Sequence, residues 1–405
     1  MIYFQDLTRE ALADLLYPLC EGKGRGLSSE EREKKKRAQS RYRAKQLFQW
    51  VYQKGVTSWE EMTDVSQKTR LWLSENVEIY FPKEKVHQIS TDGTMKFLWT
   101  LKDEKTIESV ILPHALKEKG NDAFVEVNSD QCHAHETDVE IDSNQWSRLT
   151  ACISSQVGCA MGCKFCLTGI QGLDRHLKTH EIVGQIHALR KIAPITNIVF
   201  MGMGEPLHNV DAVIDACKIL LDSTGLHFSK RKITVSTSGL VPAIERLIGE
   251  TDVSLAVSLN ATTDEIRNQI MPVNKRWPLK DLMRCIRSLP LHRHRKVTFE
   301  YVLLKEINDS EEDIDRLIQL VKGIPALVNL IPFNAHSGSD FSRPNDEKVR
   351  RFQKRLMDEG VTATVRISRG RDILAACGQL RSLFGTARGT DRHRDFSVVT
   401  PGTSL

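Results

Sequence analysis

From residue 149 onward, short apolar runs of strand length alternate with segments of helical periodicity. The strand-like runs, rich in β-branched residues, cover 149–155, 195–202, 232–238, 253–260, 297–304 and 328–333. The helical segments between them cover 180–191, 210–221, 241–249, 279–289 and 311–323. Repeated strand–helix units predict a parallel sheet with helices packed against it, and six such units predict an α/β fold with a partial or closed barrel.

A smaller unit of mainly helical character precedes these repeats, over residues 1 to about 100. The spacing of apolar residues predicts helices over 6–16 and 43–54. The stretch between them, 23–39, is densely charged, and residues 21–54 hold eleven Lys and Arg against four Glu. This stretch is either a solvated loop or exposed helix face, or a flexible basic arm that binds the phosphates of a nucleic acid.

A β-hairpin is predicted between the two units. Residues 91–102 read as a turn and a strand with period-two alternation, and 106–113 as the partner strand. Glu108 lies inside this apolar strand, where a lone acid either faces solvent on an edge strand or has a chemical role. Residues 114–146 are polar and non-periodic, which predicts a surface insertion. Its metal-binding side chains are a candidate metal site or part of a solvated loop: Cys132, His133, His135 and Glu136.

Composition places the chain among globular proteins. A chain of 405 residues with 40% hydrophobic residues can form one large domain and a smaller one. The first ten residues carry charge where a secretion signal needs an apolar run, and no stretch has the length of a membrane span. We therefore expect a cytoplasmic protein, in which nine cysteines do not form a disulfide framework. Cys217 and Cys285 fall in apolar helical patterns and are expected to be buried.

Three cysteines follow the first predicted strand of the repeats. Cys159, Cys163 and Cys166 have the spacing C-x-x-x-C-x-x-C, with small residues around them and Phe165 between two of them. A structural zinc site takes four ligands, whereas a cubane iron–sulfur cluster can take three thiolates and leave its fourth iron open for a substrate. The pattern favours a cluster with an open iron, and the alternatives are a zinc knuckle with a distant fourth ligand or reduced cysteines without metal.

Polar residues also follow the later strands, and the carboxyl ends of parallel strands lie on one face of a barrel. Gly204 permits a ligand to approach the backbone, and Glu205 can accept a hydrogen bond from an ammonium group. Ser236 ends the third strand and Asn334 the sixth, where each can bond to ribose or an adenine edge. The end of the fourth strand adds Ser258, Leu259 and Asn260.

A seventh strand is predicted over 362–368, and Cys377 follows it as a single cysteine before a glycine. By itself, such a cysteine is either a buried structural thiol or a reactive one in a tight bend. Its surroundings, together with the cysteine loop and one stretch of the first unit, resemble the RlmN-type RNA adenine methyltransferases, a group of radical S-adenosylmethionine enzymes. The segments that carry the resemblance are 42–52, 150–166 and 373–380.

This resemblance implies a fold and a set of ligands. The expected fold is a partial (β/α)6 radical-SAM barrel with a small N-terminal helical accessory domain and a β-hairpin linker. The expected divisions are an RNA-binding accessory domain over 1–100, a linker strand and insertion over 101–147, a core barrel over 148–372 and a C-terminal segment over 373–405. Cys159, Cys163 and Cys166 would hold one [4Fe-4S] cluster. S-adenosylmethionine, two molecules per turnover, would be bound by Gly204, Glu205, Ser236, Ser258, Leu259, Asn260 and Asn334, with Asn260 standing where some members have His.

The resemblance also implies a reaction, methylation of carbon 2 of an adenosine in the peptidyl transferase centre of 23S rRNA and next to the anticodon of tRNA. Cys377 would take a methyl group from one S-adenosylmethionine, and a radical made from a second would activate that methyl for addition to the base. Cys152 would then form a transient disulfide with Cys377, while Glu108 removes the ring proton. The expected electron donor is a flavodoxin or ferredoxin, and the expected state is a monomer that does not bind a membrane.

Two other functions stay open at this point. The related Cfr-type methyltransferases share the cysteine set and modify carbon 8 of adenine instead of carbon 2. A non-catalytic RNA-binding protein that holds zinc in its cysteine loop belongs to a different class.

Overall fold

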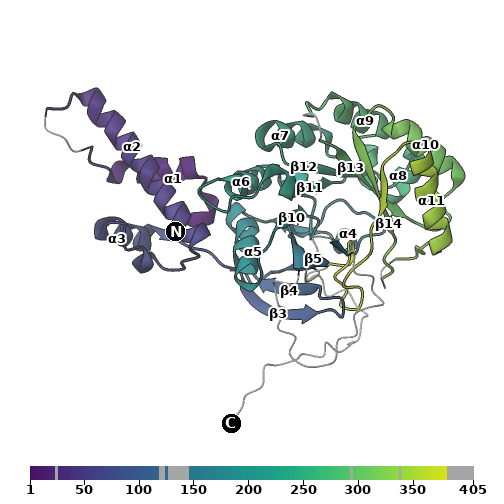
Figure 1. Ribbon diagram of the computed structural model, residues 1–405, viewed down its shortest axis with the longest axis horizontal. Helices are drawn as coiled ribbons and strands as arrows, with labels where there is room; N and C mark the ends of the chain where they lie inside the picture. The colour runs from purple at the N-terminus through teal and green to yellow at the C-terminus, as the bar shows by residue number, and fades with distance from the viewer. Residues whose placement is uncertain (23–25, 118–123, 126–145, 292–294, 337–338, 381–405) are drawn as a thin grey trace, which may run out of the picture.

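One mixed β-sheet organises the molecule (Figure 1). The computed structural model describes residues 1–22, 26–117, 124–125, 146–291, 295–336 and 339–380. The sheet runs in the order β15-β14-β13-β12-β11-β10-β7-β5-β4-β3, and its strands from β7 to β15 pair in parallel. These parallel strands are β7 (Trp146–Cys152), β10 (Asn197–Phe200), β11 (Ile233–Thr237), β12 (Ser254–Ser258), β13 (Val297–Leu303), β14 (Ala326–Pro332) and β15 (Ala363–Val365).

Helices alternate with these strands and pack around the sheet (Figure 1). They are α5 (Thr179–Ile192), α6 (Val210–Leu221), α7 (Val241–Thr251), α9 (Leu279–Ser288), α10 (Glu311–Val321) and α11 (Asp346–Asp358). The predicted strand–helix alternation is confirmed, with ends that differ from the predicted ones by a few residues. The sheet ends at β15 on one side, so the partial form of the barrel is the one observed.

The predicted hairpin is confirmed and forms part of the same sheet. β4 (Met95–Thr100) and β5 (Thr106–Lys117) pair antiparallel, with Leu98 opposite Glu108. β5 also pairs antiparallel with β7, which extends the barrel sheet beyond its first parallel strand. A further strand that the sequence did not suggest, β3 (Lys83–Ile89), pairs with β4 at the sheet edge. Its Lys and Glu side chains are typical of an edge strand exposed to solvent.

The N-terminal unit is helical, as predicted. It contains α1 (Arg9–Leu16), α2 (Ser29–Phe48), a π-helical turn (Gln49–Gln53) and α3 (Gln67–Asn76). Ser28 caps α2, because its side chain accepts from the Glu31 N–H while the Glu31 carboxylate accepts from the Ser28 N–H. Residues 29–39 are therefore an exposed helix face, and the alternative of a flexible arm is wrong for them.

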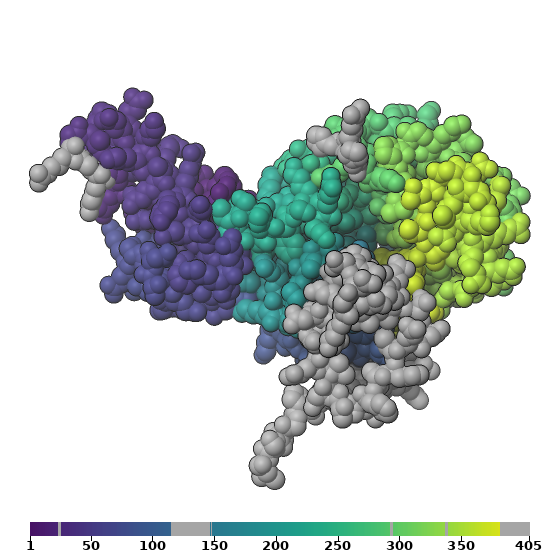
Figure 2. Space-filling view, in the orientation of Figure 1, coloured from purple at the N-terminus to yellow at the C-terminus, as the bar shows by residue number. Residues whose placement is uncertain are grey.

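This unit projects from the body as a separate lobe and is fixed to it by its first residues (Figure 2). Gln5 exchanges two hydrogen bonds with the Tyr80 backbone, at 2.8 and 2.9 Å. Asp6 pairs with His180 at the start of α5, at 2.9 Å. Arg9 also pairs with Asp222, the residue after α6, at 3.2 Å. Within the lobe, β1 (Ile2–Tyr3) pairs in parallel with β2 (Val77–Glu78). The candidate metal ligands of the predicted insertion, Cys132, His133, His135 and Glu136, lie outside the described residues.

Candidate active site

The cysteine loop lies between the short strand β8 (Gln156–Gly158) and the short helix α4 (Leu167–Gln171). Gly158 has φ of +76°, and a Cβ there would lie 1.9 Å from the Gly172 oxygen, so only glycine fits. The loop backbone is fixed from two sides: the Cys159 N–H donates to Gly172 O at 2.8 Å, and the Lys164 N–H to Ile270 O at 3.0 Å. These contacts fix the loop to the residue that follows α4 and to the end of the helix 264–270.

Most of the predicted ligands meet at one cavity of about 160 Å³. Its lining includes the three loop cysteines together with Gly204, Glu205, Ser236, Ser258, Asn260, Asn334 and Cys377. Leu259 is not among the lining residues; its side chain is fully buried, and its carbonyl accepts from Arg267 at 2.9 Å. The structure thus brings the predicted ligands together at one cavity, with the exception of Leu259.

Glu205 has its carboxylate held in a fixed orientation. One oxygen accepts from the Leu207 N–H at 3.0 Å and the other from the Ser238 N–H at 2.7 Å. Burial raises the pKa of Glu205, and these backbone donors oppose that rise by stabilising the charged form. Its own N–H donates to the buried Gln156 side chain at 2.8 Å. A carboxylate fixed in this way can receive an ammonium group at the cavity wall.

Two of the other predicted ligands already have partners within the protein. The Ser236 hydroxyl donates to Glu300 of β13 at 2.8 Å. The Asn260 carboxamide oxygen accepts from the Val302 N–H at 2.8 Å. Glu300 lines the cavity as well, and the sequence reasoning missed it. The signal was available, since Glu300 is a lone acid inside an apolar strand, as Glu108 is.

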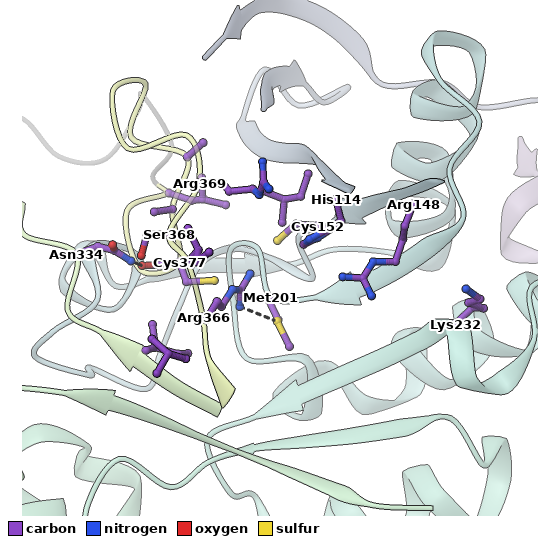
Figure 3. Close-up of a pocket in the computed structure, with 17 residues that line it drawn as sticks. His114, Arg148, Cys152, Met201, Lys232, Asn334, Arg366, Ser368, Arg369 and Cys377 are labelled. Carbon is purple, nitrogen blue, oxygen red and sulfur yellow. Dashed lines mark hydrogen bonds between the residues drawn. The ribbon is translucent and has the colours of Figure 1, made fainter. Parts of the chain in front are cut away.

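A second cavity, of about 530 Å³, is shown in Figure 3. Its lining includes Cys152 at the end of β7 and the basic side chains of Arg148, Lys232, Arg366 and Arg369. No Asp or Glu is among the described residues that line it. The two cavities share four lining residues, which are Met201, Ile331, Asn334 and Cys377. Cys377 therefore stands at the wall between a space that faces the cysteine loop and a space lined by positive charge.

The segment that carries Cys377 is tied to the cysteine loop. Gly378 O accepts from the Leu167 N–H at 2.7 Å, and Leu380 O accepts from the Thr168 hydroxyl at 2.5 Å. Burial raises the pKa of the Cys377 thiol, and the nearby Arg366 guanidinium opposes this rise. Burial also raises the pKa of Cys152, and the charge of Cys377 adds to that effect. The two thiols line the same cavity, although they are far apart in the sequence.

Glu108 lies apart from this arrangement, because the lining of neither cavity includes it. It is buried on β5, with its carboxylate 3.3 Å from the Lys96 ammonium. It stands two residues before Val110, which pairs with Cys152. The structure therefore brings Glu108 to the strand beside Cys152 without placing its side chain at either cavity.

Comparison with known proteins identifies the family. Residues 153–318 match the model of the radical SAM superfamily, and residues 35–79 match the ribosomal RNA large subunit methyltransferase N-terminal domain. The dual-specificity RNA methyltransferase RlmN of Geobacter sulfurreducens is 47% identical over 92% of this chain and 96% of its own length. The chain belongs to the RlmN family. A second relative, RlmN 2 of Myxococcus xanthus, is 44% identical over 86% of this chain and 87% of its own length.

A solved structure supports the same assignment at the level of the fold. The radical SAM methyltransferase from Sphaerobacter thermophilus matches with a TM-score of 0.76 and 36% identity, over 94% of this chain and 99% of that one. Membership of the RlmN family makes this chain a radical SAM methyltransferase, and the radical SAM superfamily implies a [4Fe-4S] cluster and S-adenosylmethionine. None of the helices in the described part of the chain has the length and apolar character needed to cross a bilayer.

The residues present fit the cluster that the RlmN family implies. Cys159, Cys163 and Cys166 line one cavity, with Phe165 and Met161 as apolar neighbours. Among the described residues, no three or more His, Cys, Asp or Glu side chains gather where a single metal ion could bind. A cubane binds its thiolates through separate irons, so three thiols spread around one cavity suit it. Burial raises the pKa of Cys159 to about 12, and a bound cluster would hold this sulfur as thiolate instead.

Proposed function

We propose that this chain methylates carbon 2 of an adenosine in 23S rRNA and in tRNA, through an S-methylated Cys377. The observation that carries this proposal is the place of Cys377 in the wall shared by the two cavities. One cavity holds the candidate cluster ligands and Glu205. The other holds Cys152 and a basic lining. A thiol at that wall can take a methyl group from one side and present it to a base on the other.

The basic cavity suits a nucleotide of an RNA strand. Its basic side chains can neutralise phosphates: Arg148, Lys232, Arg366 and Arg369. Of these, Arg366 also lies 3.8 Å from the carboxylate of Glu300, which lines the first cavity. A base can reach Cys377 there only if it leaves its stack, which favours RNA loops over duplex. The exposed basic face of α2 offers further phosphate contacts on the N-terminal lobe, which supports the proposal that this lobe binds RNA.

On the other side of the wall, Glu205 and Asn334 would bind S-adenosylmethionine. The fixed Glu205 carboxylate suits the ammonium group of the methionyl part. The Asn334 side chain donates to Cys377 O at 3.4 Å and leaves its oxygen for a ribose or adenine donor. A cluster held by Cys159, Cys163 and Cys166 would supply the electron for reductive cleavage of S-adenosylmethionine, and this cleavage would make a hydrogen-abstracting radical available. Two S-adenosylmethionine molecules per turnover follow from this scheme.

The chain's own thiols carry the covalent steps. Cys377 as thiolate attacks the methyl group, and Arg366 favours that charged form against the cost of burial. The hydrogen-abstracting radical would take a hydrogen atom from this methyl group, and the resulting carbon radical would add to carbon 2 of the base. The adduct would lose the ring proton and one electron, which the oxidised cluster would take back. Cys152 as thiolate would then attack the sulfur of Cys377, which forms the disulfide, breaks the bond between that sulfur and the methylene carbon and leaves the electron pair on the base, where a proton completes the methyl group. Glu108 is the proposed base for the ring proton, and this role requires its side chain to leave Lys96, because it lines neither cavity.

The proposed reaction also needs partners. An external one-electron donor such as a flavodoxin or ferredoxin would reduce the cluster, and a reductant would reopen the disulfide after each turnover. We propose that the chain acts as a monomer.

The experiment is methylation of RNA from a strain that lacks this activity, with mass spectrometry of the nucleosides. Wild-type enzyme with a reconstituted cluster should form 2-methyladenosine, and Cys377→Ala should form none. Cys285→Ala is the matched control, because Cys285 is a buried thiol outside both cavities. Methylation that survives in Cys377→Ala would refute the proposal, and 8-methyladenosine as product would assign the Cfr-type reaction instead.

A further inference from the structure

Arg267 of α8 (Asp264–Ile270) is a fully buried cation. Its guanidinium donates to four groups: Leu259 O at 2.9 Å, Ser238 O at 2.7 Å, Ser258 O at 3.1 Å and the Asn274 side-chain oxygen at 2.8 Å. All four acceptors are neutral. Among the ion pairs between described residues, none involves Arg267. The guanidinium has hydrogen-bond acceptors, but none of these acceptors carries a negative charge.

Such a charge is costly to bury unless an opposite charge lies close by. Asp264 is linked to Arg267 through Asn274, whose side chain accepts from the guanidinium and donates to the Asp264 carboxylate, each at 2.8 Å. Burial lowers the pKa of Arg267 to about 10, and the charge that most opposes this is that of Cys163. At neutral pH the guanidinium is therefore still a cation. Burial raises the pKa of Cys163 well above its usual value, so its sulfur would act on Arg267 as an anion only as a ligand of the cluster.

The position of α8 explains this interaction. The last residue of the helix, Ile270, accepts at its carbonyl from the Lys164 N–H of the cysteine loop at 3.0 Å. Met271, the next residue, lines the cavity together with Cys163. The carbonyls that Arg267 binds belong to the ends of β11 and β12, where Ser238 and Ser258 line that cavity as well. Arg267 thus lies directly behind the wall against which the proposed cluster binds.

We propose that Arg267 is a positioning residue that acts through Cys163 and raises the reduction potential of the cluster. This inference rests on the proposed function, since it takes Cys163 as a cluster ligand. A [4Fe-4S]²⁺ cluster with three thiolates carries a net charge of −1, and it becomes −2 when it takes one electron from an external donor. A buried cation favours the more negative state, and net charge is among the factors that set such potentials. Arg267 would therefore ease electron entry.

The experiment compares full-length reconstituted wild type with Arg267→Gln and Arg267→Lys. Iron and sulfide are quantified first, and the reduced cluster is then followed by electron paramagnetic resonance in a titration with dithionite. At the wild-type midpoint potential, the ratio of reduced to oxidised cluster should be about tenfold lower in Arg267→Gln. This corresponds to a midpoint potential about 59 mV lower for a one-electron couple. Arg267→Lys keeps the charge, so its ratio should stay within about threefold of wild type. Arg284→Met, which removes an exposed arginine of α9, should leave the ratio unchanged.

A role limited to bracing the strand ends would weaken S-adenosylmethionine binding in both Arg267 variants without moving the midpoint. A full cluster with an unchanged midpoint in Arg267→Gln therefore overturns the inference. If that variant does not fold, the double variant Asn274→Asp with Asp264→Asn decides, because it exchanges the carboxylate and the carboxamide, puts the carboxylate beside the guanidinium at unchanged net charge and should lower the ratio in the same direction. An unchanged midpoint there would be equally decisive against the role. A wild-type protein that binds no cluster would instead refute the proposed function.

Discussion

Replacement of Gly204 by alanine tests how tightly the cavity wall is built around the backbone. Gly204 has φ of +103°, and a Cβ there would lie 2.5 Å from Gln156 Cβ, 2.7 Å from its Cγ and 2.8 Å from its backbone N. A left-handed backbone costs an L-residue about 1–2 kcal/mol. Overpacking of a well-packed site adds about 1–3 kcal/mol. Because a backbone atom cannot rotate away, we expect Gly204→Ala to lower the free energy of unfolding by about 2–5 kcal/mol.

Two further glycines separate the two causes. Gly323 has φ of +78° with nothing within 4 Å of the added Cβ, so Gly323→Ala carries only the backbone cost, about 1–2 kcal/mol. Gly249 lies in α7 without a positive φ, and nothing lies within 4 Å of an added Cβ. Gly249→Ala should therefore raise the free energy of unfolding by about 0.5–1 kcal/mol. Urea unfolding followed by tryptophan fluorescence measures all three variants against wild type.

The same substitution should affect ligand binding. Glu205 follows Gly204 directly, and its N–H bond to Gln156 is the contact that the new methyl group would disturb. Equilibrium dialysis with S-adenosylmethionine should therefore show weaker binding by Gly204→Ala and unchanged binding by Gly323→Ala. The reasoning is refuted if Gly204→Ala and Gly323→Ala have free energies of unfolding within about 0.5 kcal/mol of each other.

Three other predictions follow from individual contacts. Burial lowers the pKa of His187 from 6.5 to about 4. The unfolded chain therefore binds the proton at a higher pH than the folded chain, and the free energy of unfolding falls as pH drops from 6.5 to 4. His187→Gln should flatten this decline, as measured by urea unfolding. Asp372→Asn weakens bonds from the Ser90 hydroxyl and the Thr91 N–H, so limited trypsin digestion should cut the 366–380 segment faster than in wild type. Arg366→Gln removes the cation that opposes the raised pKa of Cys377, so the pH profile of Cys377 methylation by S-adenosylmethionine should shift to higher pH; an unshifted profile would contradict the assigned contact.

The repeating part of the fold could be predicted because its signals are local. Each parallel strand is an apolar run between turn residues, and α6 begins and ends where the periodicity indicates. The strand β3 was missed, because an edge strand that faces solvent has no apolar face to produce an alternating pattern. In the N-terminal unit, residues 29–39 left two alternatives open, and the Ser28 capping box decides for a helix.

The candidate site was predictable to the extent that its residues follow strand ends. Gly204, Ser236 and Asn334 meet because parallel strands place their carboxyl ends on one face. Arg267 follows no strand, and only the packing of α8 shows that its charge is buried near the cysteine loop. For Glu108, the position in the strand could be predicted from the sequence, but the direction of its side chain toward Lys96 could not.

The position of Cys377 in the wall between the two cavities has a consequence for the order in which the cofactor and the RNA bind. Because Cys377 lines both cavities, the sulfonium cofactor and the RNA need not occupy the protein together for the first transfer. Under the proposed function, Cys377 can therefore receive its methyl group before the protein binds RNA. Mass spectrometry of enzyme purified from cells without added substrate would then find the methylated form, and the methylated fraction would report how often the protein meets its RNA.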